Sequence, residues 1–185
     1  MRIKAPKEKR ILRIKTTFRW IAYLLVIFIC FIIMTSGTWL KPILLVPAAM
    51  CISMRNGQLS SAFTGAFCGL LIDVACGRLF GFNAVILAAL CAMVSLVFEL
   101  YLRQRFFNYL WITAVAALVQ LWLDYKFYYQ IWSFSDSDLI FRTVTMKVWI
   151  YTIISALVVY PVYRLIDRLL MPKTHLTIEE AIRTN

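Results

Sequence analysis

The amino-acid sequence predicts an all-α polytopic membrane protein, a compact bundle of about six transmembrane helices. Of its 185 residues, 62% are hydrophobic and 16% are charged, and the mean hydropathy is +0.78. Ordinary soluble domains are about 45–50% apolar and about 25% charged, and a single domain of this length has too little interior to bury the excess. The composition therefore argues against a disordered chain, a secreted disulfide scaffold and a soluble enzyme.

A basic tail precedes the first apolar run. Residues 1–19 contain eight Lys and Arg residues, and the apolar run extends from Trp20 to about Met34. Secretory signals have the same order of segments, but no small-residue cleavage site follows Met34, and further apolar runs do. We therefore interpret residues 1–19 as a cytoplasmic tail and the run as an uncleaved first span.

Five further apolar runs complete a predicted six-span domain over residues 20–170. The first of them, Pro42–Met54, is short and contains Pro47 as a second proline, so a re-entrant hairpin and a five-span protein stay open as alternatives. About 20 residues cross a bilayer. Leu59–Cys76 and Phe80–Leu100 are close to this length, Tyr109–Leu123 is slightly short, and Val144–Leu165 is long enough to span with some tilt.

The distribution of Lys and Arg predicts the orientation. Cytoplasmic loops of membrane proteins carry an excess of these residues. With six spans and the N-terminus inside, residues 171–185 form a cytoplasmic C-terminal tail, and both termini face the cytoplasm. Only five of the twenty Lys and Arg residues then lie outside: Lys41, Arg78, Lys126, Arg142 and Lys147.

The formal net charge of +11 indicates an anionic partner. In a soluble protein, such an excess would favour nucleic-acid binding. Here the basic residues adjoin apolar runs, and no base-stacking module is recognisable. We therefore expect anionic membrane lipid, bound through the basic N-terminal tail, and no nucleic acid.

The sequence predicts neither an enzyme nor a cofactor. It shows no nucleophile–base pair, metal-ligand set or phosphate-binding loop. Its five cysteines lie in apolar stretches without a Cys-x-x-Cys pair, which favours buried thiols over disulfides or zinc. His175 has no metal-ligand neighbours and is interpreted as a solvated tail residue, while the lone Ser60 and Ser95 are interpreted as helix-packing residues.

The longest connection, Asp124–Thr143, is rich in aromatic side chains such as Trp132 and Phe134 and falls outside in this topology. Aromatic rings gather at the depth of lipid headgroups, and exposed apolar patches also mark protein interfaces. Contact with lipid and contact with a partner protein both stay open.

Small residues recur every four positions in and after the Leu59–Cys76 run. Gly65 and Gly69 form the small-x-x-x-small pattern that lets membrane helices approach closely. The two stripes could pack against each other or receive a helix from another protein. The first stripe comprises Gly65, Gly69, Asp73, Gly77 and Gly81, and the second comprises Ala84, Ala88 and Ala92.

Asp73 shares the first stripe near the outer end of its span. A carboxylate at membrane depth is costly unless it is paired or hydrated. Pairing with Arg78 or capping of the next helix near Asn83 would satisfy it. A role in ion or proton coupling is the alternative, but transport normally needs more than one intramembrane ionisable group. The other acid, Glu99, is explained by pairing with the basic residues that follow it, Arg103 and Arg105.

The run from Gly65 to Gly81, GAFCGLLIDVACGRLFG, resembles the signature of the bacterial rod shape-determining protein MreD family. That signature is a G-x-x-x-G-x-x-x-D helix, a turn containing glycine and an L-x-G-like segment. Chain length, span pattern and the basic N-terminus also agree.

The resemblance implies a non-enzymatic scaffold of the cell-elongation machinery in the bacterial inner membrane. Such a protein binds MreC and, through it, associates with MreB filaments, the RodA glycosyltransferase and its partner transpeptidase, and so helps organise peptidoglycan synthesis and rod shape.

The resemblance also implies a fold similar to that of the substrate-binding component of energy-coupling-factor transporters. A vitamin-transporter component of that kind is therefore the alternative function. Two features oppose it: Ala22 stands alone in the first span, where such components carry an A-x-x-x-A pattern, and Thr35–Lys41 is too short for a ligand-covering loop.

Overall fold

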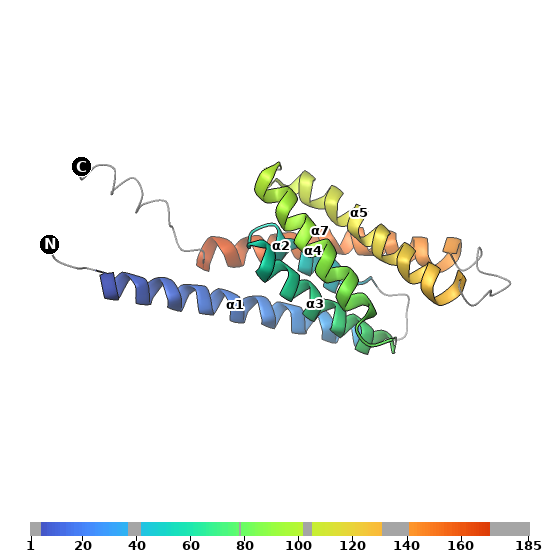
Figure 1. Cartoon of the computed structure of the whole chain (residues 1–185), viewed down its shortest axis with the longest axis horizontal. Helices are drawn as coiled ribbons and strands as arrows, with labels where there is room; N and C mark the ends of the chain where they lie inside the picture. The colour runs from blue at the N-terminus through green and yellow to red at the C-terminus, as the bar shows by residue number, and fades with distance from the viewer. Residues whose placement is uncertain (1–4, 37–41, 78, 102–104, 131–140, 171–185) are drawn as a thin grey trace.

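A computed structural model describes residues 5–36, 42–77, 79–101, 105–130 and 141–170 (Figure 1). Within these ranges the chain forms helices and no strands, which confirms the predicted all-α class. Two π-helical turns, η1 (Lys126–Gln130) and η2 (Phe141–Thr145), flank residues 131–140. The α-helices are α1 (Ala5–Thr35), α2 (Leu45–Ser53), α3 (Gln58–Cys76), α4 (Phe82–Leu100), α5 (Phe106–Tyr125) and α7 (Met146–Leu170).

Five helical segments of the described chain are long and apolar enough to cross a membrane, as expected for a multi-pass protein. Helix α2 is different: its nine residues extend about 14 Å, against about 30 Å for the hydrocarbon core. The second predicted run is therefore not a full-length spanning helix. The five segments are Ile14–Thr35, Gln58–Cys76, Phe82–Leu100, Phe106–Tyr128 and Phe141–Leu170.

Helix α2 and its flanking residues return the chain along the bundle. Helix α1 ends at Thr35, yet Asn56, which follows α2, accepts a hydrogen bond from Arg19 near the start of the α1 span. Helix α1 begins and α7 ends at the same end of the bundle, which we call the terminal end (Figure 1). The α3–α4 connection marks the opposite end, which we call the turn end. The side of the membrane that each end faces stays a prediction.

Every residue of α2 is buried. The helix contacts each of the other α-helices and so forms the centre of the bundle. Pro47 is tolerated because it lies in the first turn, where a missing backbone N–H breaks no helical hydrogen bond. Its carbonyl accepts a hydrogen bond of 3.2 Å from the Tyr109 hydroxyl of α5.

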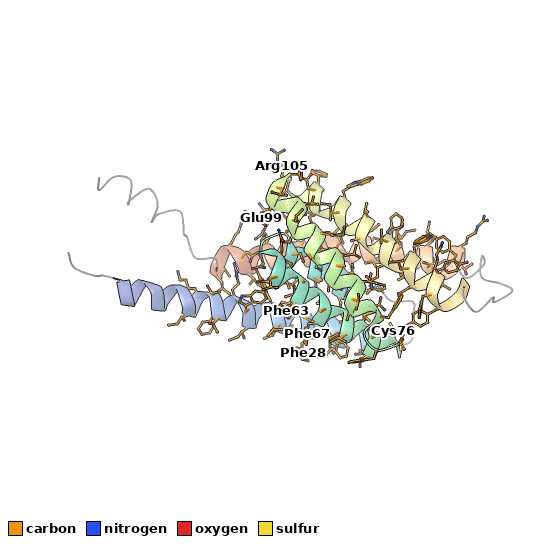
Figure 2. All side chains as sticks on the ribbon, in the orientation of Figure 1. Phe28, Phe63, Phe67, Cys76, Glu99 and Arg105 are labelled. Carbon is orange, nitrogen blue, oxygen red and sulfur yellow. The ribbon has the colours of Figure 1, made fainter. Side chains whose placement is uncertain are left out.

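The outer surfaces of the long helices are apolar. Large side chains point outward along α1 and α3, among them Phe28, Phe63 and Phe67 (Figure 2). A helix that is apolar on its inner and outer faces is suited to lipid rather than water. The bundle thus has an apolar outer surface as well as an apolar core.

No disulfide joins the five cysteines among the described residues, and the prediction that they are buried holds for four of them. Cys76 is exposed, contrary to that prediction. It is the last residue of α3, where the chain leaves the packed bundle to enter the turn (Figure 2).

Candidate functional site

The two glycines of the small-x-x-x-small pattern lie directly against α4. A Cβ atom on Gly65 would lie 2.5 Å from the carbonyl oxygen of Leu87, and one on Gly69 would lie 2.4 Å from the Cα atom of Ala84. Either contact is far shorter than a real Cβ contact, and both involve backbone that would have to move. Glycine therefore permits α3 and α4 to make the most extensive helix contact of the described chain.

The face of α4 that meets these glycines differs in part from the predicted alanine stripe. Ala84 is buried against Gly69, but Ala88 and Ala92 are only half-buried. A spacing of four residues advances about 40° around a helix at each step, so the stripe drifts away from the contact. Leu87 and Cys91 occupy the face instead, at the alternating three- and four-residue spacing that would have identified them.

Helices α3 and α4 are joined by a turn that needs glycine twice. Gly77 has a φ of +61° and ends α3, while Gly81 has a φ of +97° and precedes α4. Both values lie in the left-handed region, which costs glycine little. The predicted turn is present, although Arg78 lies outside the described residues.

Asp73 is buried and caps the start of α4. Its Oδ2 atom accepts a 2.9 Å hydrogen bond from the Gly81 backbone N–H. Its Oδ1 atom accepts the backbone N–H of Asn83 at 3.3 Å and the side-chain Nδ2–H at 2.9 Å. Three donors and the positive end of the helix dipole thus stabilise the carboxylate. Of the arrangements considered from the sequence, this geometry is the capping one.

The hydrogen bonds continue from Asp73 into α5. The Oδ1 atom of Asn83 accepts a 3.0 Å hydrogen bond from Gln120 Nε2, and both side chains are fully buried. We call Asp73, Asn83 and Gln120 the turn-end cluster, which joins α3, α4 and α5. Gln120 was not among the residues predicted from the sequence, although an amide in the middle of an apolar run is a signal for a buried hydrogen bond.

A second polar group lies near the terminal end. The buried carboxylate of Asp167 on α7 accepts a hydrogen bond from the Tyr23 hydroxyl of α1 and forms an ion pair with Arg55, between α2 and α3. Neither Asp167 nor Arg55 was among the site residues predicted from the sequence. The residues lie 144 and 112 positions from their partner, so no local pattern indicates the contacts.

Arg19 extends this group towards α4. Its Nη2–H donates to Asn56 Oδ1 at 2.9 Å, and its guanidinium carbon lies 5.7 Å from the centre of the Tyr23 ring. The Asn56 carbonyl in turn accepts the Ser95 hydroxyl of α4 at 2.7 Å. We call Arg19, Tyr23, Arg55, Asn56 and Asp167 the terminal-end cluster.

The two clusters are well separated. Asp73 follows Gln58 by fifteen residues of α3, which corresponds to about 22 Å along the helix. Each cluster satisfies a carboxylate that would otherwise be costly in a bilayer. Each also fixes three or more chain segments relative to one another.

Other residues singled out from the sequence belong to neither cluster. Glu99 is exposed, and the described residues contain no ion pair between it and Arg105 (Figure 2). Arg103, the other expected partner, lies outside the described residues, so pairing with it stays a prediction. No group of three or more His, Cys, Asp or Glu residues in the described ranges could hold a metal ion. Several candidates lie outside those ranges, namely Lys41, Arg103, Trp132, Phe134 and His175.

Substitution of Gly69 by Ala should destabilise the protein by about 1–3 kcal/mol, because the added methyl group overpacks the α3–α4 backbone contact. The matched control is Gly57→Ala, since nothing lies within 4 Å of a Cβ atom there. The thermal unfolding midpoint in detergent measures the effect. Equal midpoints for the two variants would show that the close approach is unimportant.

Substitution of Asp73 by Leu should leave the chain inserted but lower its stability by about 1–3 kcal/mol, because three N–H groups lose their acceptor. Asp73→Asn keeps one acceptor oxygen and should lose less. Membrane fractionation and thermal unfolding test both points, and an Asp73→Leu protein as stable as wild type would contradict the capping role.

Breaking the Asp167–Arg55 pair should cost about 3–5 kcal/mol in either Asp167→Asn or Arg55→Gln, because each leaves a polar partner buried without its counter-charge. The double variant should lose clearly less than the two single losses combined. Denaturant or thermal unfolding of all four proteins measures this coupling. Additive losses would mean that the pair contributes no mutual stabilisation.

Residues 9–169 match the family model described as rod shape-determining protein MreD. The match includes both clusters and the α3–α4 contact, and it confirms the resemblance seen in the sequence. Neither a curated protein nor a solved structure matches the chain. The predicted similarity to the fold of energy-coupling-factor components therefore stays a prediction.

Proposed function

Because the chain belongs to the rod shape-determining protein MreD family, we propose that it is a non-enzymatic scaffold of the bacterial cell-elongation machinery. The family establishes a role in rod shape determination, and the five apolar helical segments fit a multi-pass inner-membrane protein. The finer proposal is that the chain binds an MreC-like protein and, through it, associates with MreB, RodA and its partner transpeptidase. It would thereby help organise peptidoglycan synthesis.

We further propose that the terminal end faces the cytoplasm. The excess of Lys and Arg in the tails and in the connections at that end supports this orientation. Residues 1–19 would then adjoin the anionic lipid of the cytoplasmic leaflet.

The observation that carries the scaffold proposal is an open apolar groove between α5 and α7. Its volume is about 800 Å³. Trp111 is 74% exposed at this groove, and Trp149 is held in its wall by a 2.9 Å hydrogen bond from Nε1 to the Ala114 carbonyl. Large aromatic side chains in a pocket are typical anchors of protein interfaces. Further lining residues are Phe107, Leu110, Val115, Leu118 and Ile153.

We assign this groove to a membrane helix of the MreC-like partner. Gly65 and Gly69 are covered by α4, so a partner helix needs another face. In this proposal the two glycines and Ala84 serve packing within the bundle, while Asp73, Gly77 and Gly81 shape the turn that orders α4.

Filling the groove tests the proposal. Val115→Trp should reduce recovery of the MreC-like partner about tenfold, a loss equivalent to about 1.4 kcal/mol. Val85→Trp is the matched control, because Val85 is also exposed, on α4 away from this groove. The measurement is a mild-detergent pull-down of the tagged protein from its native membrane, quantified by mass spectrometry at equal protein levels.

Two results would contradict the proposal. Recovery of the partner with Val115→Trp at the wild-type level would exclude this groove as its site. Recovery of paired ATPases with a coupling membrane subunit by the wild-type protein, in place of an MreC-like protein, would overturn the scaffold function itself.

A further inference from the structure

A second lateral groove lies between α1 and α3, on the side of the molecule where Phe63 and Phe67 are labelled (Figure 2). Its volume is about 340 Å³. From Ser60 to Phe67 it extends about 10 Å along α3. Apolar side chains dominate its lining: Trp20, Leu24, Ile27, Phe63 and Phe67, with Ser60 and Thr64.

Positive charge is in excess beside this groove. The terminal-end cluster contains two guanidinium groups but one carboxylate, and Asp167 forms its ion pair with Arg55. Arg19 is left with the neutral Asn56 as its hydrogen-bond partner. Its Nε atom is buried and has no hydrogen-bond partner among the described residues. A guanidinium group without a carboxylate partner is suited to a phosphate oxygen.

The charge and the groove adjoin. Arg19 immediately precedes Trp20, which lines the groove, and its guanidinium group lies over Tyr23, which also lines it. Asn56, the partner of Arg19, lies four residues before Ser60. Lys15, one helical turn earlier on α1, is exposed and adds a second cation.

We infer that the α1–α3 groove holds an acyl chain of an anionic phospholipid whose phosphate is bound by Arg19. The unbalanced guanidinium charge favours this occupant over an apolar helix of a partner protein, which would leave that charge without a counter-ion. The inference rests on the proposed membrane location but not on binding of an MreC-like protein.

The test titrates the purified full chain in detergent with phosphatidylglycerol and with phosphatidylcholine of the same acyl chains, read by native mass spectrometry. Wild type should prefer phosphatidylglycerol. Arg19→Gln should weaken phosphatidylglycerol binding about fivefold, as expected for one cation at a membrane surface, and leave phosphatidylcholine binding unchanged. The matched control is Arg105→Gln, which removes the same charge at an exposed position distant from α1 (Figure 2).

Because Arg19→Gln also removes the hydrogen bond to Asn56, a second variant leaves the cluster intact. Ser60→Trp fills the groove and should abolish the preference for phosphatidylglycerol, whereas Ser60→Ala should retain it. The inference would be overturned if Ser60→Trp bound the two lipids as wild type does, or if wild type bound both lipids with equal affinity. The inference would also be overturned if Ser60→Trp lost the MreC-like partner but bound both lipids as wild type does, because the groove would then be a site for a partner helix. If Val115→Trp does not reduce recovery of the MreC-like partner, the result of the lipid titration is unaffected.

Discussion

A carboxylate inside a lipid bilayer must find its hydrogen-bond donors within the protein, because the hydrocarbon core offers none. Asp73 finds them at the start of α4, and Asp167 finds them on Tyr23 and Arg55. Between them the turn-end and terminal-end clusters connect α1, α3, α4, α5 and α7. The arrangement of the long helices is thus specified at both ends by polar contacts, and not by apolar packing alone.

The short α2 fits between these two ends. Its residues are buried and it contacts every other α-helix, so the long helices surround it. The close α3–α4 contact at Gly65 and Gly69 has a related effect, because it brings two spans together where no side chain could intervene. Apolar grooves lie at other helix pairs, one between α5 and α7 lined by Trp149 and one between α1 and α3 lined by Phe63.

The features that were predicted correctly from the sequence are those that depend on local sequence pattern. Hydropathy indicated the helices. The glycines at Gly77 and Gly81 indicated a turn, so capping of the next helix by Asp73 was one of the predicted arrangements. Contacts between distant segments were missed, because nothing near Asp167 signals Tyr23 or Arg55. The alanine stripe failed at Ala88 and Ala92 for a geometric reason, since residues spaced by four rotate away from a contact face.

The contact between Asp167 and Arg55 has a consequence for biosynthesis. The two residues are 112 positions apart, and at about 5–20 residues per second a ribosome needs roughly 6–22 seconds to make the second after the first. During that interval Arg55 and Tyr23 lack the carboxylate that they contact in the folded protein. A chain that stops before α7 keeps those polar groups unsatisfied, which distinguishes it from the finished protein. The polar contacts at the terminal end are therefore complete only after α7 has been made.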